Sequence, residues 1–309
     1  MTARNALVLA ARDTIAQGSQ SFAAASKLFA PVTRERAWLL YAWCRAADDL
    51  TDGQELGHGA VPLADPAQAQ AELERLTAAA LDGDTPLPLP FEALRLVARE
   101  TGMPRRFIED HLAGFALDAA GWRPGSEEDL LRYCYHVAGT VGCMMAVVMG
   151  VAPDDQDTLD RACDLGLAFQ LANIARDIVP DAQTGRCYLP AAWLREAGLT
   201  EADLADPARR AAVAHLAARL VELSRPYRRS ARVGAARLPF RSRLAVLAAD
   251  GIYGAIGEKV FALGLAAWDR RVRVSSAGKL GLLAGAALRS CITPSLASRA
   301  GLWTRPRQS

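Results

Sequence analysis

The stretch that decides the fold is Leu165-Gly-Leu-Ala-Phe-Gln-Leu-Ala-Asn-Ile-Ala-Arg-Asp-Ile-Val-Pro-Asp181. Its apolar residues recur at helical spacing, so it predicts an α-helix with a largely apolar surface. Gln170, Asn173, Asp177 and Asp181 follow steps of three, four and four residues, which places them on one helix face. Amides and carboxylates on an otherwise apolar helix indicate that this face holds a ligand inside a bundle.

A second segment, Tyr41-Ala-Trp-Cys-Arg-Ala-Ala-Asp-Asp-Leu-Thr-Asp52, repeats this arrangement. Tyr41, Arg45, Asp48 and Asp52 share one helix face. Like charges one turn apart destabilise a bare helix by a few tenths of a kcal/mol, so we expect a cation beside Asp48 and Asp52. Asp49 and Asp52 are also helical neighbours, three residues apart. The sequence therefore leaves open whether Asp48 or Asp49 pairs with Asp52.

Taken singly, each acidic segment also fits a solvated helix face. Two acidic pairs on separate helices with apolar flanks instead favour carboxylates that face each other across a bundle cavity. Oxygen ligands without Cys or His select hard cations, so we expect Mg²⁺ or Mn²⁺ and a diphosphate substrate. Arg45, Arg176 and Arg186 lie in or near the two segments, and a guanidinium fork suits diphosphate oxygens. The alternative for each arginine is a surface salt bridge.

The composition is that of a globular protein. Of 309 residues, 51% are hydrophobic and 23% are charged, and the formal net charge is +2. With so small a charge and no nucleic-acid-binding motif, we expect no nucleic-acid partner. No signal peptide stands out, no apolar run approaches the roughly 18 residues of a spanning helix, and six scattered cysteines suit a reducing compartment. We therefore expect a cytoplasmic protein.

Helical periodicity dominates the chain, and alternation typical of strands is nearly absent. No linker divides it convincingly, so the sequence predicts one all-α domain over residues 1–309. Thr33 and Ser126 are the expected N-caps of two helices. The expected helices cover residues 3–28, 33–52, 66–81, 90–101, 104–121, 126–150, 155–180, 207–230, 240–266 and 277–290.

Several motifs, taken together, resemble those of the squalene and phytoene synthases, and most closely the bacterial phytoene synthases. The resemblance runs from about residue 18 to residue 275 and leaves a basic segment, residues 276–309. It implies a single-domain, isoprenoid-synthase-like helical bundle with a central cavity. The motifs are Ser19-Gln-Ser-Phe22, Tyr41-Ala-Trp-Cys-Arg45, Asp48-Asp-Leu-Thr-Asp52, Tyr133-Cys-Tyr-His-Val-Ala-Gly139, Asn173-Ile-Ala-Arg-Asp-Ile-Val-Pro-Asp181 and Gly185-Arg-Cys-Tyr-Leu-Pro190.

The resemblance also implies roles for individual residues. The implied catalytic residues are Asp48, Asp52, Asp177, Asp181, Tyr41 and Arg45. The implied metal ligands are the same four aspartates and Asn173. Positions that match the family's substrate-binding residues are Ser19, Ser21, Phe22, Tyr41, Arg45, Tyr133, Val137, Gly139, Gln170, Asn173, Arg176, Arg186 and Tyr188.

By the same resemblance, the protein is a prenyltransferase of the 15-cis-phytoene synthase type, acting in the first step of carotenoid biosynthesis. It would join two geranylgeranyl diphosphates head to head, through the cyclopropyl prephytoene diphosphate, and release two diphosphates. The alternative is a C30 enzyme that makes dehydrosqualene or squalene from farnesyl diphosphate. Squalene synthases quench the last cation with hydride, whereas the closer likeness favours proton loss, so we expect no NADPH. A catalytically inactive scaffold relative remains a further alternative.

Two positions depart from the family pattern. Gln20 stands where several relatives carry a basic residue. Pro180 falls between the aspartates of the second motif, and a proline inside a helix removes a backbone hydrogen bond and favours a kink. We therefore expect the helix to end near Pro180 and Asp181 to lie off the stripe.

The segment from Asp269 to Ser309 carries eight Lys or Arg residues and one acid, with leucines interleaved. This pattern suggests contact with an anionic membrane surface. With the resemblance, it implies peripheral attachment to the inner membrane and contact with other carotenoid enzymes. The alternative is a solvated helix and a loose tail.

Overall fold

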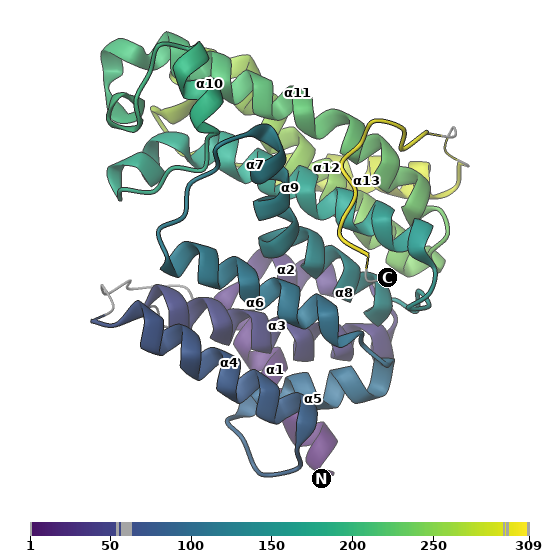
Figure 1. Cartoon of the computed structure of the whole chain (residues 1–309). Helices are drawn as coiled ribbons and strands as arrows, with labels where there is room; N and C mark the ends of the chain where they lie inside the picture. The colour runs from purple at the N-terminus through teal and green to yellow at the C-terminus, as the bar shows by residue number, and fades with distance from the viewer. Residues whose placement is uncertain (1, 54–55, 57–63, 293, 295–296, 308–309) are drawn as a thin grey trace. The chain divides into compact units, whose positions relative to one another are not determined.

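The computed structural model describes residues 2–53, 56, 64–292, 294 and 297–307, and the side chains of Gln20, Ser21 and Asp52 lie outside that description. The described residues form helices and no strand (Figure 1), so the all-α prediction is confirmed. The chain divides into two compact units, Met1–Ala120 with Met144–Asp155, and Gly121–Cys143 with Gln156–Ser309. Each unit has its own helices and its own buried residues.

The first unit is built around α3, which packs against α1, α4 and α5. Trp43 of α3 is fully buried, and its indole N–H donates to the hydroxyl of Thr77 over 3.3 Å. Burial of a large ring with its polar atom satisfied anchors the helix that carries the first acidic motif. The helices are α1 Ala3–Gly18, α2 Gln20–Ser26, α3 Pro31–Asp52, α4 Pro66–Asp82, α5 Leu89–Thr101 and α6 Arg105–Ala119.

The helix expected over residues 3–28 is instead two helices that meet at Ser19. The Ser19 hydroxyl accepts the backbone N–H of Phe22 over 3.3 Å and so caps the second helix. The expected cap at Thr33 is wrong, because α3 begins at Pro31, whose fixed φ and missing N–H suit a first helical position.

The second unit is organised by α9, which packs against η1, α11 and α12, while α12 packs against α13. Figure 1 shows α9 running alongside α11 and α12. Ser126 is the N-cap of α7, as expected, and the structure adds a reciprocal capping box with Asp129. The helices are α7 Glu127–Cys134, π-helix η1 Tyr135–Gly139, α8 Thr140–Val148 (which continues into the first unit), α9 Gln156–Gln183, α10 Ala191–Glu196, η2 Glu201–Ala205, η3 Pro207–Arg209, α11 Arg210–Ala235, α12 Phe240–Leu263, η4 Gly264–Trp268 and α13 Ser276–Ser290.

Helix α9 continues through Pro180 to Gln183, so the expectation that it ends at the proline is wrong. Pro180 lies in the last turn, where its fixed φ suits a helix, and it removes only the one backbone hydrogen bond that residue 180 would donate to the carbonyl of Arg176. The carbonyl of Asp181 accepts the backbone N–H groups of Thr184 and Arg186 over 3.0 and 2.9 Å, which closes the helix end. Asp181 therefore stays on α9.

The helix expected over residues 126–150 is interrupted by the π-helix η1. The backbone N–H of Thr140 reaches back five residues to the carbonyl of Tyr135, the bond that defines this wider turn. The wider turn lies directly on α9, because a Cβ added at Gly166 would come within 2.2 Å of the carbonyl oxygen of Ala138.

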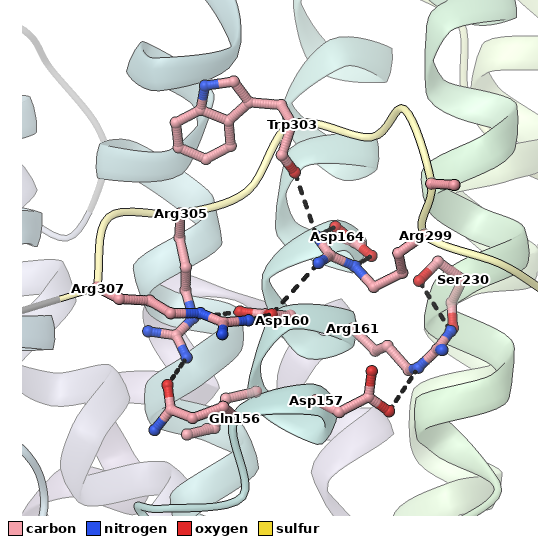
Figure 2. Close-up of polar contacts among 12 residues, drawn as sticks. Gln156, Asp157, Asp160, Arg161, Asp164, Ser230, Arg299, Trp303, Arg305 and Arg307 are labelled. Carbon is pink, nitrogen blue, oxygen red and sulfur yellow. Dashed lines mark hydrogen bonds and ion pairs between the residues drawn. The ribbon is translucent and has the colours of Figure 1, made fainter.

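Residues 297–307, called the strap below, lie along the first half of α9 without regular secondary structure, apart from a turn at residues 300 and 301. Figure 2 shows three strap arginines meeting two carboxylates of α9. The alternative of a loose tail is therefore wrong for these residues. The residues in contact are Arg299, Arg305 and Arg307 of the strap and Asp160 and Asp164 of α9.

Candidate functional site

The first acidic motif lies at the end of α3, in the first unit. Arg45 supplies the expected cation: its Nη2 lies 3.2 Å from the carboxylate of Asp48, and its Nη1 lies 3.5 Å from that of Asp49. The Asp49 carboxylate also accepts the backbone N–H of Leu56 over 2.9 Å. Asp49 therefore holds the chain that follows the helix. The side chain of Asp52 lies outside the described residues.

Tyr41 lies one turn before Arg45 on the same helix. Its hydroxyl is buried and makes no hydrogen bond among the described residues, although Arg45 is near it. A Cβ at Gly18 would come within 2.6 Å of this hydroxyl, and the ring of Phe22 lies 5.5 Å away, edge to face. Burial raises the pKa of Tyr41, so the hydroxyl keeps its proton at neutral pH. Tyr41 thus offers a free donor beside a cation.

The structure therefore brings together several of the residues expected around the first motif. Those whose side chains are described are Ser19, Phe22, Tyr41, Arg45 and Asp48. Ser21, another expected binding residue, has its side chain outside the description.

The second acidic motif lies on α9, in the second unit. The side-chain amide of Asn173 donates to Gln170 over 3.5 Å, as neighbours on one face should. Asp177 is held by Arg176, whose Nε donates to it over 2.9 Å, and by Arg271, whose Nη2 lies 3.4 Å away. Arg271 is 94 residues distant in sequence, so only the fold reveals it.

Asp181 completes the stripe and differs electrostatically from Asp177. Burial and the charge of Asp177 raise the pKa of Asp181 to about 6, against the lowering effect of Arg186, Arg176 and Arg271. The charges of these arginines therefore only partly offset the cost of ionising Asp181 at this position.

Three aromatic rings form a row beside the segment that follows the second motif. The ring of Tyr133 stacks between Trp122 at 5.8 Å and Tyr188 at 4.9 Å. Arg123, next to Trp122, donates to the backbone carbonyl of Gly185 over 2.5 Å and so ties the two segments together. Tyr133 and Tyr188 were expected at the site, whereas Trp122 and Arg123 carry no motif that marks them in the sequence.

Val137 and Gly139, also expected at the site, lie in the π-helix η1. Val137 is half-buried, and Gly139 is buried against α9. A Cβ at Gly139 would come within 2.8 Å of the Cys163 sulfur and 2.9 Å of a Leu167 methyl carbon. The requirement for glycine at 139 is thus one of helix packing.

A tyrosine on α12 joins the second cluster without any sequence signal. The ring of Tyr253 stacks on Phe169 of α9 with centroids 4.1 Å apart. Burial raises the pKa of Tyr253, while the nearby charge of Arg176 lowers it. Tyr253 therefore stacks its ring on α9 and keeps a protonated hydroxyl near Arg176 of the second motif.

The donor set of both clusters fits a hard divalent cation bound together with substrate. Among the residues that the structure describes, no three His, Cys, Asp or Glu side chains lie close enough to hold a metal unaided. Mg²⁺ in phosphate-processing sites typically takes one or two carboxylates and completes its shell with waters and substrate oxygens. The raised pKa of Asp181 and the unbonded Tyr41 hydroxyl fit groups that bind a metal ion or a substrate oxygen.

Comparison with known proteins agrees with these features. The sequence pattern of the squalene/phytoene synthase family matches residues 15–277. The chain is 48% identical over 301 residues to the phytoene synthase of Pseudescherichia vulneris, covering 96% of this chain and 97% of that protein. It is 49% identical over 294 residues to the 15-cis-phytoene synthase of Enterobacter agglomerans, covering 94% and 99%. The crystal structure of a dehydrosqualene synthase in complex with ligand superposes with a TM-score of 0.81 at 26% identity, covering 92% of this chain and 96% of that one.

Proposed function

Because this chain belongs to the squalene/phytoene synthase family and is a prenyltransferase, we propose that it condenses two molecules of geranylgeranyl diphosphate to phytoene. The observation that carries the proposal is the 48–49% identity to phytoene synthases over nearly the whole of both chains. The expected match region, residues 18–275, agrees with the 15–277 that the family pattern covers.

The proposed reaction has two ionisations. In the first, one substrate loses its diphosphate, and the resulting allylic cation alkylates the double bond of the second substrate. Loss of a proton then gives the cyclopropyl prephytoene diphosphate. In the second ionisation this intermediate loses its diphosphate, the ring rearranges, and loss of another proton gives phytoene. Two diphosphates and two protons leave in total.

The chain's own charged groups act on the departing diphosphates. We propose that Arg45 and Arg176 bind diphosphate oxygens, and that the unbonded Tyr41 hydroxyl donates a hydrogen bond to one of them. Mg²⁺ or Mn²⁺, when bound by the aspartates and Asn173, would supply the additional positive charge that stabilises the leaving group. Asp48 and Asp52 are the proposed ligands of the first motif, because Asp49 is engaged with the Leu56 backbone.

Aromatic groups are proposed to shield the cations. Phe22 and Tyr41 in the first unit, and Tyr188 in the second, are proposed to present ring faces or edges to the cations, which attract positive charge without trapping it covalently, and Tyr133 supports Tyr188 by stacking on it. Their apolar bulk also excludes water, which would quench an allylic cation to an alcohol. Gln170, Val137 and Gly139 are proposed to line the same substrate sites.

The direct test is product analysis. Purified protein is incubated with geranylgeranyl diphosphate and Mg²⁺, without NADPH, and the hexane extract is analysed by mass and absorbance. A C40 hydrocarbon with the absorbance of a conjugated triene supports the proposal. A C30 product from farnesyl diphosphate, with none from the C20 substrate, overturns the proposed chain length. An active Asp177→Ala variant would overturn the metal assignment.

We also propose that the enzyme touches an anionic membrane surface through α13. No helix among the described residues is both long and apolar enough to cross a membrane. The side chains of Leu280, Leu288 and Ile292 are nevertheless exposed, at 68%, 71% and 61%. The two leucines lie eight residues apart on the same side of α13, and exposed Arg289 follows Leu288. An apolar row beside basic residues suits an interface rich in anionic lipid, where a C40 hydrocarbon can be released.

A further inference from the structure

The strap contacts α9 where two aspartates are almost completely removed from water. Asp160 and Asp164 are one turn apart and only 1% and 0% exposed. Two buried carboxylates this close require compensation, because burial and mutual repulsion both disfavour their charges. Burial does raise the pKa of Asp164, while Arg299 lowers it.

The strap supplies that compensation. Arg299 binds Asp164 through two hydrogen bonds of 2.8 and 2.9 Å, in the parallel fork geometry that suits a guanidinium. The buried Arg305 places its Nε 2.9 Å from Asp160 and donates to the side-chain oxygen of Gln156 over 2.5 Å. These contacts appear together in Figure 2.

Between these two arginines, Trp303 is fixed at both of its backbone polar groups. Its N–H donates to the hydroxyl of Tyr227 over 3.2 Å, and its carbonyl accepts from Arg299 over 3.2 Å. Its ring then lies 5.6 Å from the fully buried ring of Tyr135. The hydrogen bonds and ion pairs of the strap therefore fix the position at which the Trp303 ring packs against Tyr135.

Tyr135 is the first residue of η1, the π-helix that carries Val137 and Gly139. A π-helical turn is rare, occurs mostly as a single wider turn within an α-helix, and is frequent at functional sites. Here the α9 turn at Cys163–Leu167 contacts Gly139, and the strap contacts Tyr135. Both ends of η1 are thus held by the α9 and strap assembly.

We propose that the strap positions the π-helix for substrate binding, with Trp303 and Arg305 as positioning residues that act through Tyr135 and Asp160. The proposal rests on the proposed function, because Val137 and Gly139 are expected to contact the prenyl chain. Loss of the indole would let η1 relax toward an ordinary helical turn and shift Val137. The prenyl chain would then lose contacts made equally in the bound and transition states, which raises KM more than it lowers kcat.

The test compares the full chain with Trp303→Ala, Trp303→Phe and the control Thr304→Ala, whose side chain is exposed between the two positioning residues. The first measurement is amide hydrogen exchange of peptides covering residues 133–143, which needs no substrate. We expect exchange about tenfold faster in Trp303→Ala, with Trp303→Phe and Thr304→Ala close to the parent chain. Unchanged exchange in Trp303→Ala overturns the proposal.

The second measurement is steady-state kinetics with geranylgeranyl diphosphate. We expect kcat/KM to fall about tenfold in Trp303→Ala, mostly through KM, and to recover in Trp303→Phe. A fall in kcat alone, in proportion to the folded fraction, would mean that Trp303 only stabilises the fold. If Trp303→Ala does not fold, Trp303→Leu is measured in the same way. A parent chain without turnover would reject the proposed function, while the exchange result still decides the positioning role.

Discussion

Asp181 follows Asp177 by one turn of α9, and the two half-buried carboxylates share one face of the helix. Burial and the neighbouring charge of Asp177 raise the pKa of Asp181 to about 6, from an ordinary value of 3.8. A group whose pKa is raised on folding stabilises the fold when protonated. That contribution is complete below about pH 3.8 and is lost as the pH rises through about 6.

The metal-free protein should therefore gain stability from Asp181→Asn at neutral pH. The amide keeps the shape and removes the charge, so we expect a higher melting temperature than the parent at about pH 7.5 in the presence of a chelator. The difference should shrink as the pH falls from about 7 to about 5. Thermal melts across this range measure it, and a lower melting temperature for the variant at about pH 7.5 would contradict the assigned shift. The same variant should lose turnover with metal present.

The two neighbouring aspartates at the end of α3 should differ in function. Asp48→Asn should lower kcat by about a thousandfold, because loss of a metal ligand removes several kcal/mol of charge stabilisation. Asp49→Asn should lower kcat by less than about tenfold and reduce stability slightly, because its carboxylate holds the Leu56 backbone. Steady-state kinetics on both variants show whether Asp48 or Asp49 is the metal ligand, and circular dichroism checks that both variants fold. The reverse order of effects would assign the metal to Asp49.

Close packing of η1 on α9 should make Gly166 intolerant of any side chain. Gly166→Ala would place a Cβ 2.2 Å from the Ala138 carbonyl oxygen, and such overpacking costs about 3 kcal/mol or more. Gly281→Ala on α13 is the matched control, since no atom lies within 4 Å of its added Cβ. The control should raise stability by about 1 kcal/mol through helix propensity. Denaturant midpoints of the two variants measure this difference. Equal midpoints would mean that η1 and α9 can move apart at little cost in stability.

The leucines of α13 should determine membrane binding. Replacing both Leu280 and Leu288 with Ser should reduce co-sedimentation with anionic vesicles by at least about tenfold, because each buried leucine contributes roughly 1.5–3 kcal/mol. Vesicles of neutral lipid should bind the parent chain more weakly. These substitutions leave the strap intact, whereas truncation after Gly278 would remove it. Unchanged sedimentation would place the contact on another surface.

Features encoded locally were predictable from the sequence. Helix periodicity placed α4, α5 and α13 within two residues of their ends, and the polar stripe from Gln170 to Asp177 lies on α9 as expected, whereas Asp181 was wrongly expected to lie off it. The N-cap at Ser126 was also predictable, because the cap and the acidic first turn are adjacent in sequence. Each of these signals lies within one or two helical turns.

Features that depend on distant partners were not predictable. The π-helix η1 is held against α9 through close contacts at Gly139 and Gly166, which no local pattern reports. Arg271 meets Asp177 only in the folded chain. Arg299 was counted as part of a basic membrane-facing segment, because its acidic partner Asp164 lies 135 residues away. A basic segment whose arginines pair with distant buried carboxylates, as Arg299 does here, has fewer charges left for a membrane surface.

The distance along the chain between α9 and the strap has a consequence for biosynthesis. Asp160 is made 139 residues before Arg299 and 147 residues before Arg307. At cellular synthesis rates this separation corresponds to a delay on the order of ten seconds. During that time the nascent α9 carries two carboxylates without their arginines, and it keeps them hydrated rather than buried. The second unit therefore completes its folding only after residues 299–307 have left the ribosome, so a pause in translation within this stretch delays the enzyme's maturation.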